Sequence, residues 1–364
     1  MSNEMRVESG DQVAAGAATA TEREDDGAPE TAPATAASVT DIANVDASAE
    51  SSQRAVPSIN PDSFGVIVVL WQPDATHLQN LDDTRAICRH VVAVDNSPKA
   101  DAQLHARLRE SGIEVVHNAN RGGISGAYNR GAEVVFGRGC EVMFLLDQDS
   151  QLGADFFDSM MRACADTGTD AFIVGPKVFE VNLGKYLPVF SPELRMPKPE
   201  SIDGREGLVP TLFVISSGSA ISAEAYRKVG AFREDYFIEY VDIEYGLRAT
   251  SNGVPVFVNT AAQMRQQVGQ FVKRGIFSTS NHVAWRRYYA SRNAVHALRS
   301  NSKRWSIHWL IELLTLHQVA CVLVCEEHKL RKVVAIAVGY FDGLFGKLGT
   351  FEERHPKIAA FCRH

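Results

Sequence analysis

Five short apolar runs recur between residues 65 and 174, and each is separated from the next by a segment with helical spacing. The runs are residues 65–71, 91–95, 113–117, 142–146 and 171–174, and the helical segments are 75–89, 100–111, 124–137 and 153–166. Continuous apolar runs of this length, rich in β-branched residues, are typical of strands buried on both faces. Strands that alternate with helices predict an α/β fold whose mostly parallel sheet is flanked by helices.

The first sixty residues differ in composition from the rest. Residues 8–52 are mostly Ala, Thr, Ser, Glu, Asp and Gly, which bury too little apolar surface to offset chain entropy. We therefore expect a disordered acidic leader over residues 1–60. This leader carries a charge of −8, whereas the whole chain carries −7, so the remainder is near neutral. Such a balance gives no reason to expect a nucleic-acid partner.

Two apolar stretches, residues 305–325 and 333–345, follow near the C-terminus, and Lys329, Arg331 and Lys332 lie between them. Both stretches contain polar residues, so neither is a clean run of about twenty apolar residues. Two amphipathic helices with a basic connector are suited to docking on an anionic membrane surface. A helical cap packed on the preceding domain has the same pattern, and the sequence leaves both alternatives open.

Two carboxylates, Asp147 and Asp149, directly follow the fourth apolar run. In a parallel sheet, ligands bind beyond the carboxyl ends of the strands. Carboxylates two residues apart at such an end can meet a nucleotide and a divalent cation, Mg²⁺ or Mn²⁺, together. An acidic turn with Ser150 as a helix cap would have the same pattern.

Polar residues also follow the second and third runs. Asp95 and Asn96 end the second run, where a carboxylate could accept a hydrogen bond from a base or a ribose. A glycine-rich segment, residues 120–131, follows the third run and precedes a predicted helix, whose N-terminus could face an anion. Its spacing matches neither the Gly-x-Gly-x-x-Gly dinucleotide pattern nor a phosphate loop, which argues against an NAD-binding or P-loop protein.

A second region contains a predicted strand at residues 211–215, a serine-glycine turn at 216–219 and a helix at 223–229. Beyond it, Glu239, Asp242 and Glu244 form an acidic cluster among aromatic residues. Like charges in partial burial raise carboxylate pKa values, which suits a general base. A solvated helix face is the alternative, because Arg248 lies four residues after Glu244.

Taken in order, these motifs resemble the family 2 inverting glycosyltransferases, which adopt the GT-A fold. The resemblance rests on residues 68–71, 95–97, 120–129, 147–149, 216–219 and 241–244. Within the family, residues 147–150, 237–249 and 286–293 are similar to rhamnosyltransferases, above all to those of rhamnolipid biosynthesis that form dirhamnolipid. The resemblance implies a GT-A domain over residues 61–265 and a helical C-terminal region over residues 266–364.

The activity implied is inverting transfer of L-rhamnose from dTDP-L-rhamnose to a mono-rhamnolipid, with a divalent metal ion, on the cytoplasmic face of the inner membrane. A rhamnosyltransferase of lipid-linked polysaccharide synthesis is one alternative. A catalytically weak nucleotide-sugar-binding protein is another, because Gln266 stands where related enzymes place a His. Val241 also departs from the family pattern, in which a Glu usually precedes the Asp that acts as catalytic base, here Asp242.

The resemblance also implies roles for individual residues. Asp242 would be the catalytic base and Asp149 the metal ligand. Residues that would bind the nucleotide sugar are Asp95, Asn96, Asn120, Arg121, Gly122, Asn129 and Asp147. Residues that would bind the acceptor are Ser217, Gly218, Glu239 and Glu244. Residues that could contact the diphosphate are Arg286, Arg287 and Arg292.

Overall fold

The computed structural model describes residues 60–192, 198–267, 272–275, 277–301 and 305–363, apart from the side chains of residues 278 and 305–310. The predicted acidic leader therefore lies outside the described residues, except for its last position.

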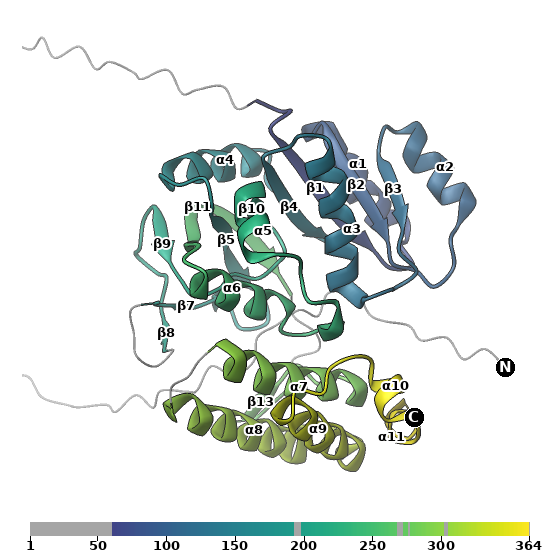
Figure 1. Cartoon of the computed structure of the whole chain (residues 1–364), viewed down its shortest axis with the longest axis vertical. Helices are drawn as coiled ribbons and strands as arrows, with labels where there is room; N and C mark the ends of the chain where they lie inside the picture. The colour runs from purple at the N-terminus through teal and green to yellow at the C-terminus, as the bar shows by residue number, and fades with distance from the viewer. Residues whose placement is uncertain (1–59, 193–197, 268–271, 276, 302–304, 364) are drawn as a thin grey trace, which may run out of the picture. The chain divides into compact units, whose positions relative to one another are not determined.

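A nine-stranded sheet forms the centre of the described α/β region (Figure 1). Its order is β3-β2-β1-β4-β10-β5-β11-β9, and β6 pairs with β5. Strands β1 to β4 are parallel, β5 and β11 are parallel to each other, and β10 is antiparallel between β4 and β5. The strands are β1 (Phe64–Leu70), β2 (His90–Asp95), β3 (Glu114–His117), β4 (Val142–Asp147), β5 (Ile173–Glu180), β6 (Lys185–Tyr186), β9 (Leu208–Pro210), β10 (Ala220–Ser222) and β11 (Val256–Gln266).

Helices cover both faces of this sheet because successive side chains of a strand point to opposite faces. In β1, Ile67 and Val69 pack with α3, α5 and α6, whereas Val66, Val68 and Leu70 pack with α1, α2 and α4. These helices are α1 (Ala75–Ile87), α2 (Ala102–Glu110), α3 (Gly123–Gly137), α4 (Phe156–Asp166), α5 (Ala223–Val229) and α6 (Val241–Ser251). The predicted α/β fold with a mostly parallel sheet flanked by helices is confirmed.

The predicted strand at residues 211–215 is wrong. Residues 211–219 are irregular and lie between β9 and β10. The backbone N–H groups of Thr211 and Leu212 donate to two different segments, at Val256 and Phe190. Because these two N–H groups donate to different segments, residues 211–215 do not pair with one neighbouring strand, although their composition favours a strand.

The C-terminal region is helical, as predicted. Its helices are α7 (Ala284–Asn301), α8 (Trp305–Cys325), α9 (Lys329–Leu344), α10 (Phe351–Arg354) and α11 (Pro356–Arg363). Tyr288 and Tyr289 of α7 share a buried core with Ala335, Phe351 and Ala359. None of the helices formed by described residues has the length and apolarity needed to cross a membrane.

Small elements complete the described chain. They are the two-stranded pairs β7 (Val189–Phe190) with β8 (Pro199–Glu200) and β12 (Val272–Arg274) with β13 (Phe277–Thr279), and a 3₁₀ turn, η1 (Glu234–Tyr236). The 3₁₀ turn leads into the backbone immediately before α6.

Candidate active site

Side chains that follow the parallel strands are tied together at one edge of the sheet. Gln148, after β4, accepts a hydrogen bond from the backbone N–H of Trp71 at 2.8 Å and donates to the carbonyl of Trp71 at 3.3 Å. Ser97, after β2, accepts from the backbone N–H of Gln72 at 2.9 Å. The ends of β1, β2 and β4 therefore form one connected edge, where the fold rule places a ligand.

Asp147 and Asp149 lie at this edge, with Asp147 half-buried and Asp149 exposed. The pKa of Asp147 is raised to about 7, mainly by burial and also by the charges of Asp149 and Asp242, although a hydrogen bond from Ser217 lowers it. A cation placed between these carboxylates would offset the repulsion that raises this pKa. The carboxylate pair therefore fits a divalent metal ion, although it supplies only two protein ligands.

No group of three or more His, Cys, Asp or Glu side chains among the described residues is arranged to hold a metal ion. Mg²⁺ in nucleotide enzymes is commonly held by one or two carboxylates together with substrate phosphates. An edge with two carboxylates is compatible with that mode, in which the ligand's diphosphate completes the coordination.

An amide cluster fills the edge beyond β2 and β3. The amide of Asn118 donates to the side-chain oxygen of Asn96 at 2.7 Å, and Asn96 donates to Asn120 at 3.2 Å. Asp95 accepts from the backbone N–H of Ser97 and lies 2.7 Å from the ring nitrogen of His105. The structure thus brings Asp95, Asn96 and Asn120 together, with both Asp95 oxygens engaged by protein groups.

The glycine-rich segment turns sharply into α3. Gly122 and Gly123 have φ values of 66° and 61°, and a Cβ on Gly123 would lie 2.0 Å from the carbonyl oxygen of Phe237. The backbone N–H of Ile124 donates to this same oxygen at 2.8 Å. Arg121 is exposed next to this helix N-terminus, where an anion is stabilised by the helix dipole.

Asn129 lies deeper along α3 and is buried. Its side-chain oxygen accepts from Phe232 and Tyr226, and its amide donates to Phe232 and Glu234. All of its hydrogen-bonding groups are therefore used by the protein, so its observed contacts fix the loop after α5.

Asp242 is the second residue of α6 and is 5% exposed. Its two oxygens accept from the backbone N–H groups of Ile243 at 2.8 Å and Ser216 at 3.4 Å. The pKa of Asp242 is raised to about 6, mainly by burial and also by the charge of Glu239, although these hydrogen bonds lower it. A carboxylate with this pKa is mostly ionised at neutral pH and can still accept a proton, as a general base must.

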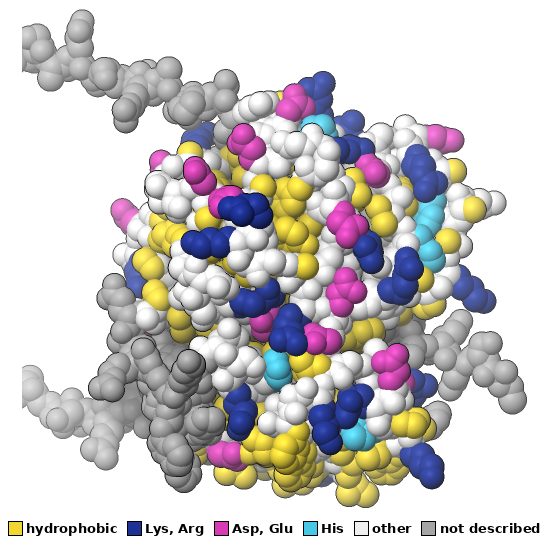
Figure 2. All heavy atoms as spheres, viewed as in Figure 1, with side chains coloured by type: hydrophobic (Ala, Val, Ile, Leu, Met, Phe, Trp, Pro, Cys, Tyr) yellow, Lys and Arg dark blue, Asp and Glu magenta, His cyan; other side chains and the backbone are white. Residues whose placement is uncertain are grey.

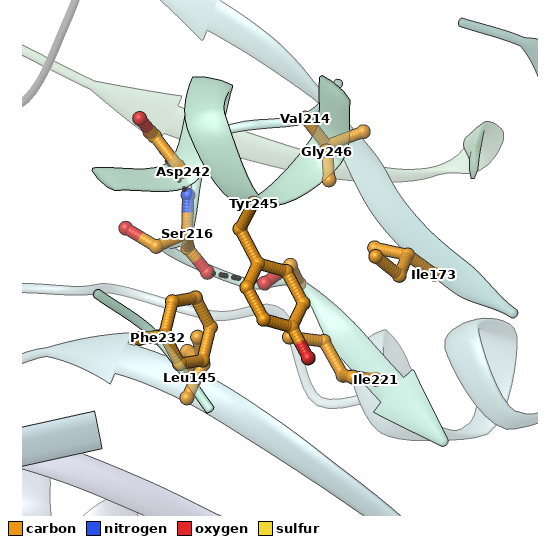
Figure 3. A pocket seen from close by; sticks show the side chains of 10 residues that line it. Leu145, Ile173, Val214, Ser216, Ile221, Phe232, Asp242, Tyr245 and Gly246 are labelled. Carbon is orange, nitrogen blue, oxygen red and sulfur yellow. Dashed lines mark hydrogen bonds between the residues drawn. The ribbon is translucent and has the colours of Figure 1, made fainter. Parts of the chain in front are cut away.

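A cavity of about 10 Å³ lies behind Asp242 and is lined mainly by apolar side chains (Figure 3). Its volume is about that of one water molecule, so it does not hold a sugar. In Figure 3 the Asp242 carboxylate points away from Leu145, Phe232 and Ile221.

The serine turn lies beside Asp242. Ser217 is 2.9 Å from Ser150, which follows Asp149, and Gly218 has a φ of 78°.

The two glutamates of the acidic cluster have cationic partners. Glu239 lies 2.7 Å from Nε of Arg286 on α7, and both side chains are buried. Glu244 forms a two-pronged ion pair with Arg248 at 2.9 and 3.0 Å. Within the described part of the chain, Asp242 accepts from backbone N–H groups, whereas Glu239 and Glu244 pair with arginines.

The other two arginines of α7 are also engaged within the protein. Arg287 pairs with Glu326, which pairs in turn with Lys332. Arg292 is fully buried and donates to the backbone carbonyls of Asp235 at 2.8 Å and Tyr236 at 3.1 Å.

Several residues at this edge were absent from the sequence prediction. Gln148 and Asn118 join strand ends, and Asn293 of α7 reaches the backbone before α6. The indole nitrogen of Trp71, directly after β1, is buried and has no hydrogen-bond partner among the residues that the structure describes. Gln148, Trp71 and Asn293 each lie within a segment that carries the resemblance, whereas Asn118 lies in none of them.

Comparisons with known proteins agree with this architecture. The model of glycosyl transferase family 2 matches residues 76–230. The dTDP-rhamnosyl transferase RfbF of Shigella flexneri is 28% identical over 298 residues, which cover 80% of this chain and 98% of that protein.

Two solved structures are also similar. S. aureus TarS has a TM-score of 0.44 and 14% identity, over 78% of this chain and 43% of that chain. GalNAc-T7 with UDP, GalNAc and Mn²⁺ has a TM-score of 0.46 and 13% identity, over 82% of this chain and 57% of that chain. This chain thus spans less than two thirds of the length of either.

The protein is a glycosyltransferase. The match to the family 2 model is limited to residues 76–230, and the sheet topology agrees with the predicted GT-A-type fold.

Proposed function

We propose that the protein is an inverting rhamnosyltransferase that uses dTDP-L-rhamnose and a glycolipid acceptor. The single observation that carries the proposal is Asp242, a buried carboxylate with a pKa of about 6. Its negative charge contributes to the raised pKa of Asp147 at the strand edge. The relative RfbF, named a dTDP-rhamnosyl transferase, supports the choice of donor.

Inversion requires one in-line displacement. The acceptor oxygen forms a bond to C1 of rhamnose while the bond from C1 to the phosphate oxygen breaks, and dTDP leaves with the bonding electrons. Asp242 takes the proton of the acceptor hydroxyl. Holding both substrates in line supplies much of the rate enhancement by proximity.

The donor is assigned to the edge formed by β1, β2 and β4. We assign Asp95, Asn96 and Asn120 to contacts with thymine or ribose, and Asp147 to the ribose or the diphosphate. Asp149 would hold Mg²⁺ or Mn²⁺, which would offset the charge that develops on the leaving diphosphate. Arg121, which is exposed next to Gly122 at the N-cap of α3, would offset the same charge.

The acceptor is assigned to the side of Asp242 next to the serine turn, at Ser217 and Gly218. We assign no direct diphosphate contact to Arg287 or Arg292, because Glu326 and backbone carbonyls occupy their guanidinium groups. For the same reason, Asn129, Glu239 and Glu244 are assigned to the framework around the site. Arg286 belongs to that framework through Glu239.

The acceptor proposed is a mono-rhamnolipid, with dirhamnolipid as the product. The same donor machinery would serve a rhamnosyltransferase of lipid-linked polysaccharide, the alternative that differs only at the acceptor. In both cases the acceptor carries a lipid, so the enzyme would meet it at the inner face of the cytoplasmic membrane.

The surface of α8 and α9 supports membrane contact. Exposed apolar residues gather on these two helices and directly after α9: Leu313, Leu316, Leu323, Val324, Leu330, Phe341 and Phe345. Figure 2 shows hydrophobic side chains over this end of the molecule, with Lys and Arg side chains near them. Lys329 and Lys347 are exposed beside Leu330 and Phe345. Apolar stripes flanked by basic residues are typical of helices that lie in an anionic membrane interface.

The test is turnover by the full chain with dTDP-L-rhamnose, supplied with mono-rhamnolipid or with a lipid-linked saccharide, and mass spectrometry of the products. We expect dirhamnolipid from the first acceptor. Product from the second acceptor alone would favour the polysaccharide alternative, and no product from either would reject the rhamnosyltransferase proposal.

A chelated sample with and without added Mn²⁺ tests the metal. We expect loss of turnover after chelation and recovery with Mn²⁺. The Asp149→Asn variant should need at least tenfold more Mn²⁺ for half-maximal activity, whereas Asp158→Asn, on the exposed surface of α4, should match the wild type. Equal activity with and without chelator would remove the metal from the proposal.

A further inference from the structure

The backbone immediately before α6 has an unusual conformation. Phe237, Glu239 and Tyr240 have φ values of 66°, 62° and 60°, in the left-handed region that bulky side chains rarely adopt. We call residues 236–240 the base turn, because Asp242 lies two residues after it. A conformation of this kind persists only where surrounding groups hold it in place.

One side chain of α7 makes several of the contacts that hold the base turn. The amide nitrogen of Asn293 lies 3.1, 2.8 and 2.8 Å from the carbonyl oxygens of Tyr236, Ile238 and Glu239. Asn293 is fully buried, so no water competes for these bonds. Its amide has two hydrogens for three acceptors, which makes one of the bonds shared.

Arg292 supports Asn293 from the adjacent position. Its Nε donates to the side-chain oxygen of Asn293 at 2.8 Å, which fixes the orientation of the amide so that its nitrogen faces the base turn. Its terminal nitrogen donates to the carbonyls of Asp235 and Tyr236. These two residues bond to backbone carbonyls and touch neither Asp242 nor the strand edge in the hydrogen bonds of the described residues.

The base turn also contacts the glycine-rich segment before α3. The carbonyl oxygen of Phe237 accepts from the backbone N–H of Ile124, and Gly123 packs against that same oxygen. The base turn therefore lies between the helix that carries Asp242 and the segment assigned to the donor. Its position bears on the distance between base and donor.

We propose that Asn293, oriented by Arg292, is a positioning residue for sugar transfer: it holds the base turn, and thereby sets Asp242 relative to the donor. This inference rests on the proposed function for the role of Asp242. It makes helix α7 part of the transfer machinery even though α7 lies outside the residues matched by the family model.

The test replaces Asn293 with Asp, which has the same shape but removes the two amide hydrogens. Asn301→Asp is the matched control, because Asn301 lies on the same helix and, among the described residues, its side chain donates to the carbonyl of Ala297 within that helix. Amide hydrogen exchange of residues 235–243 measures how firmly the base turn is held, whatever sugar the enzyme uses. The kcat divided by the number of dTDP-binding sites measures how well Asp242 acts as the base, because this division corrects for any protein that is not folded.

For Asn293→Asp we expect exchange in residues 235–243 to rise at least tenfold and kcat per site to fall about 100-fold. The donor KM should change less than fivefold, and Asn301→Asp should match the wild type. Unchanged exchange, or a kcat loss that disappears after normalisation, would overturn the inference.

Asn293→Ser retains one donor and serves if the Asp variant does not fold. Failure of both variants to fold would assign Asn293 to folding and reject the positioning role. A wild-type enzyme that does not use dTDP-L-rhamnose would defeat the proposed function, whereas the exchange measurement would still decide whether Asn293 holds the base turn.

Discussion

The carboxylate of Asp242 accepts a hydrogen bond from the backbone N–H of Ser216, 26 residues earlier in the chain, at 3.4 Å. This bond joins the first turn of α6 to the serine turn that follows the irregular segment 211–215. Both hydrogen bonds to Asp242 favour its ionised form, whereas its burial favours the neutral form, and burial has the larger effect. The balance leaves an ionised base at neutral pH.

The first prediction concerns the pH dependence of activity. Asp242 must be ionised to accept a proton, and its pKa is about 6. With donor and divalent cation saturating, kcat should be constant above pH 7 and fall about tenfold per pH unit below 6. A stopped assay across pH 4.5–8.5 measures this. Constant kcat down to pH 4.5 would show that no group with this pKa acts as the base.

The second prediction concerns the stability of Asp242→Asn. The pKa of Asp242 is raised from 3.8 to about 6 in the folded protein, so the neutral form is favoured on folding. This contribution is fully present below pH 3.8 and is lost as the pH rises through 6. At pH 8, Asn, which stays neutral, should therefore increase the free energy of unfolding by up to about 3 kcal/mol.

Urea unfolding of wild type and Asp242→Asn at pH 8 and at pH 4 measures this difference. The gain should shrink at pH 4, where much of the Asp242 population is already protonated. An equal or larger gain at pH 4 would contradict the assigned direction of the pKa shift.

The third prediction concerns the glycine at the contact between α3 and the base turn. Gly123→Ala places a Cβ 2.0 Å from the carbonyl oxygen of Phe237 at a φ of 61°, so the backbone must move. We expect a loss of about 2–4 kcal/mol in the free energy of unfolding and a weaker affinity for dTDP.

Gly137→Ala is the matched control on the same helix, because no atom lies within 4 Å of its added Cβ. It should be neutral or gain up to about 1 kcal/mol. Similar stability for the two variants, measured by urea unfolding, would show that the close approach at Gly123 is not a constraint.

The fourth prediction concerns the exposed stripes of α8 and α9. Replacing Leu316 and Leu330 together by Ser should reduce partitioning into vesicles that contain anionic lipid by ~30-fold, at about 1 kcal/mol for each side chain. Ile87→Ser, an exposed apolar residue on α1, should leave it unchanged.

Co-sedimentation with phosphatidylglycerol vesicles at low and high salt measures this partitioning. Binding should weaken at high salt because the basic residues contribute. Equal binding of the double variant and the wild type would exclude these stripes as the membrane contact. Concentration-dependent dimers, abolished by the double variant, would instead show that a second copy covers them.

Much of the fold could be predicted because its strongest signals are local. The helix at residues 223–229 was predicted with its observed bounds, since Ser222 caps it and Gly230 ends it. The parallel strands are continuous apolar runs, which are typical of strands buried on both faces. The segment 211–215 has a similar composition but is not a strand, because its backbone N–H groups donate to two segments that lie far away in the chain, at Val256 and Phe190.

The site was predictable in part. Residues at the carboxyl end of a strand, such as Asp95 and Asp147, lie at one edge of the sheet because the parallel strands end there. The contacts of Asn293 were not predictable, because they cross about 55 residues to backbone carbonyls that have no side-chain signature. In the same way, the partners of Glu239 and Arg287 depend on where α7 packs.

The fifth prediction tests the central claim, that Asp242 is the base of a rhamnosyl transfer. Turnover of dTDP-L-rhamnose with mono-rhamnolipid is measured at pH 8 for wild type and Asp242→Asn, together with dTDP binding by calorimetry. The account predicts dirhamnolipid from the wild type and a kcat lower by at least 100-fold in the variant, with dTDP affinity within threefold. A variant that binds dTDP and retains kcat within tenfold of the wild type would contradict it.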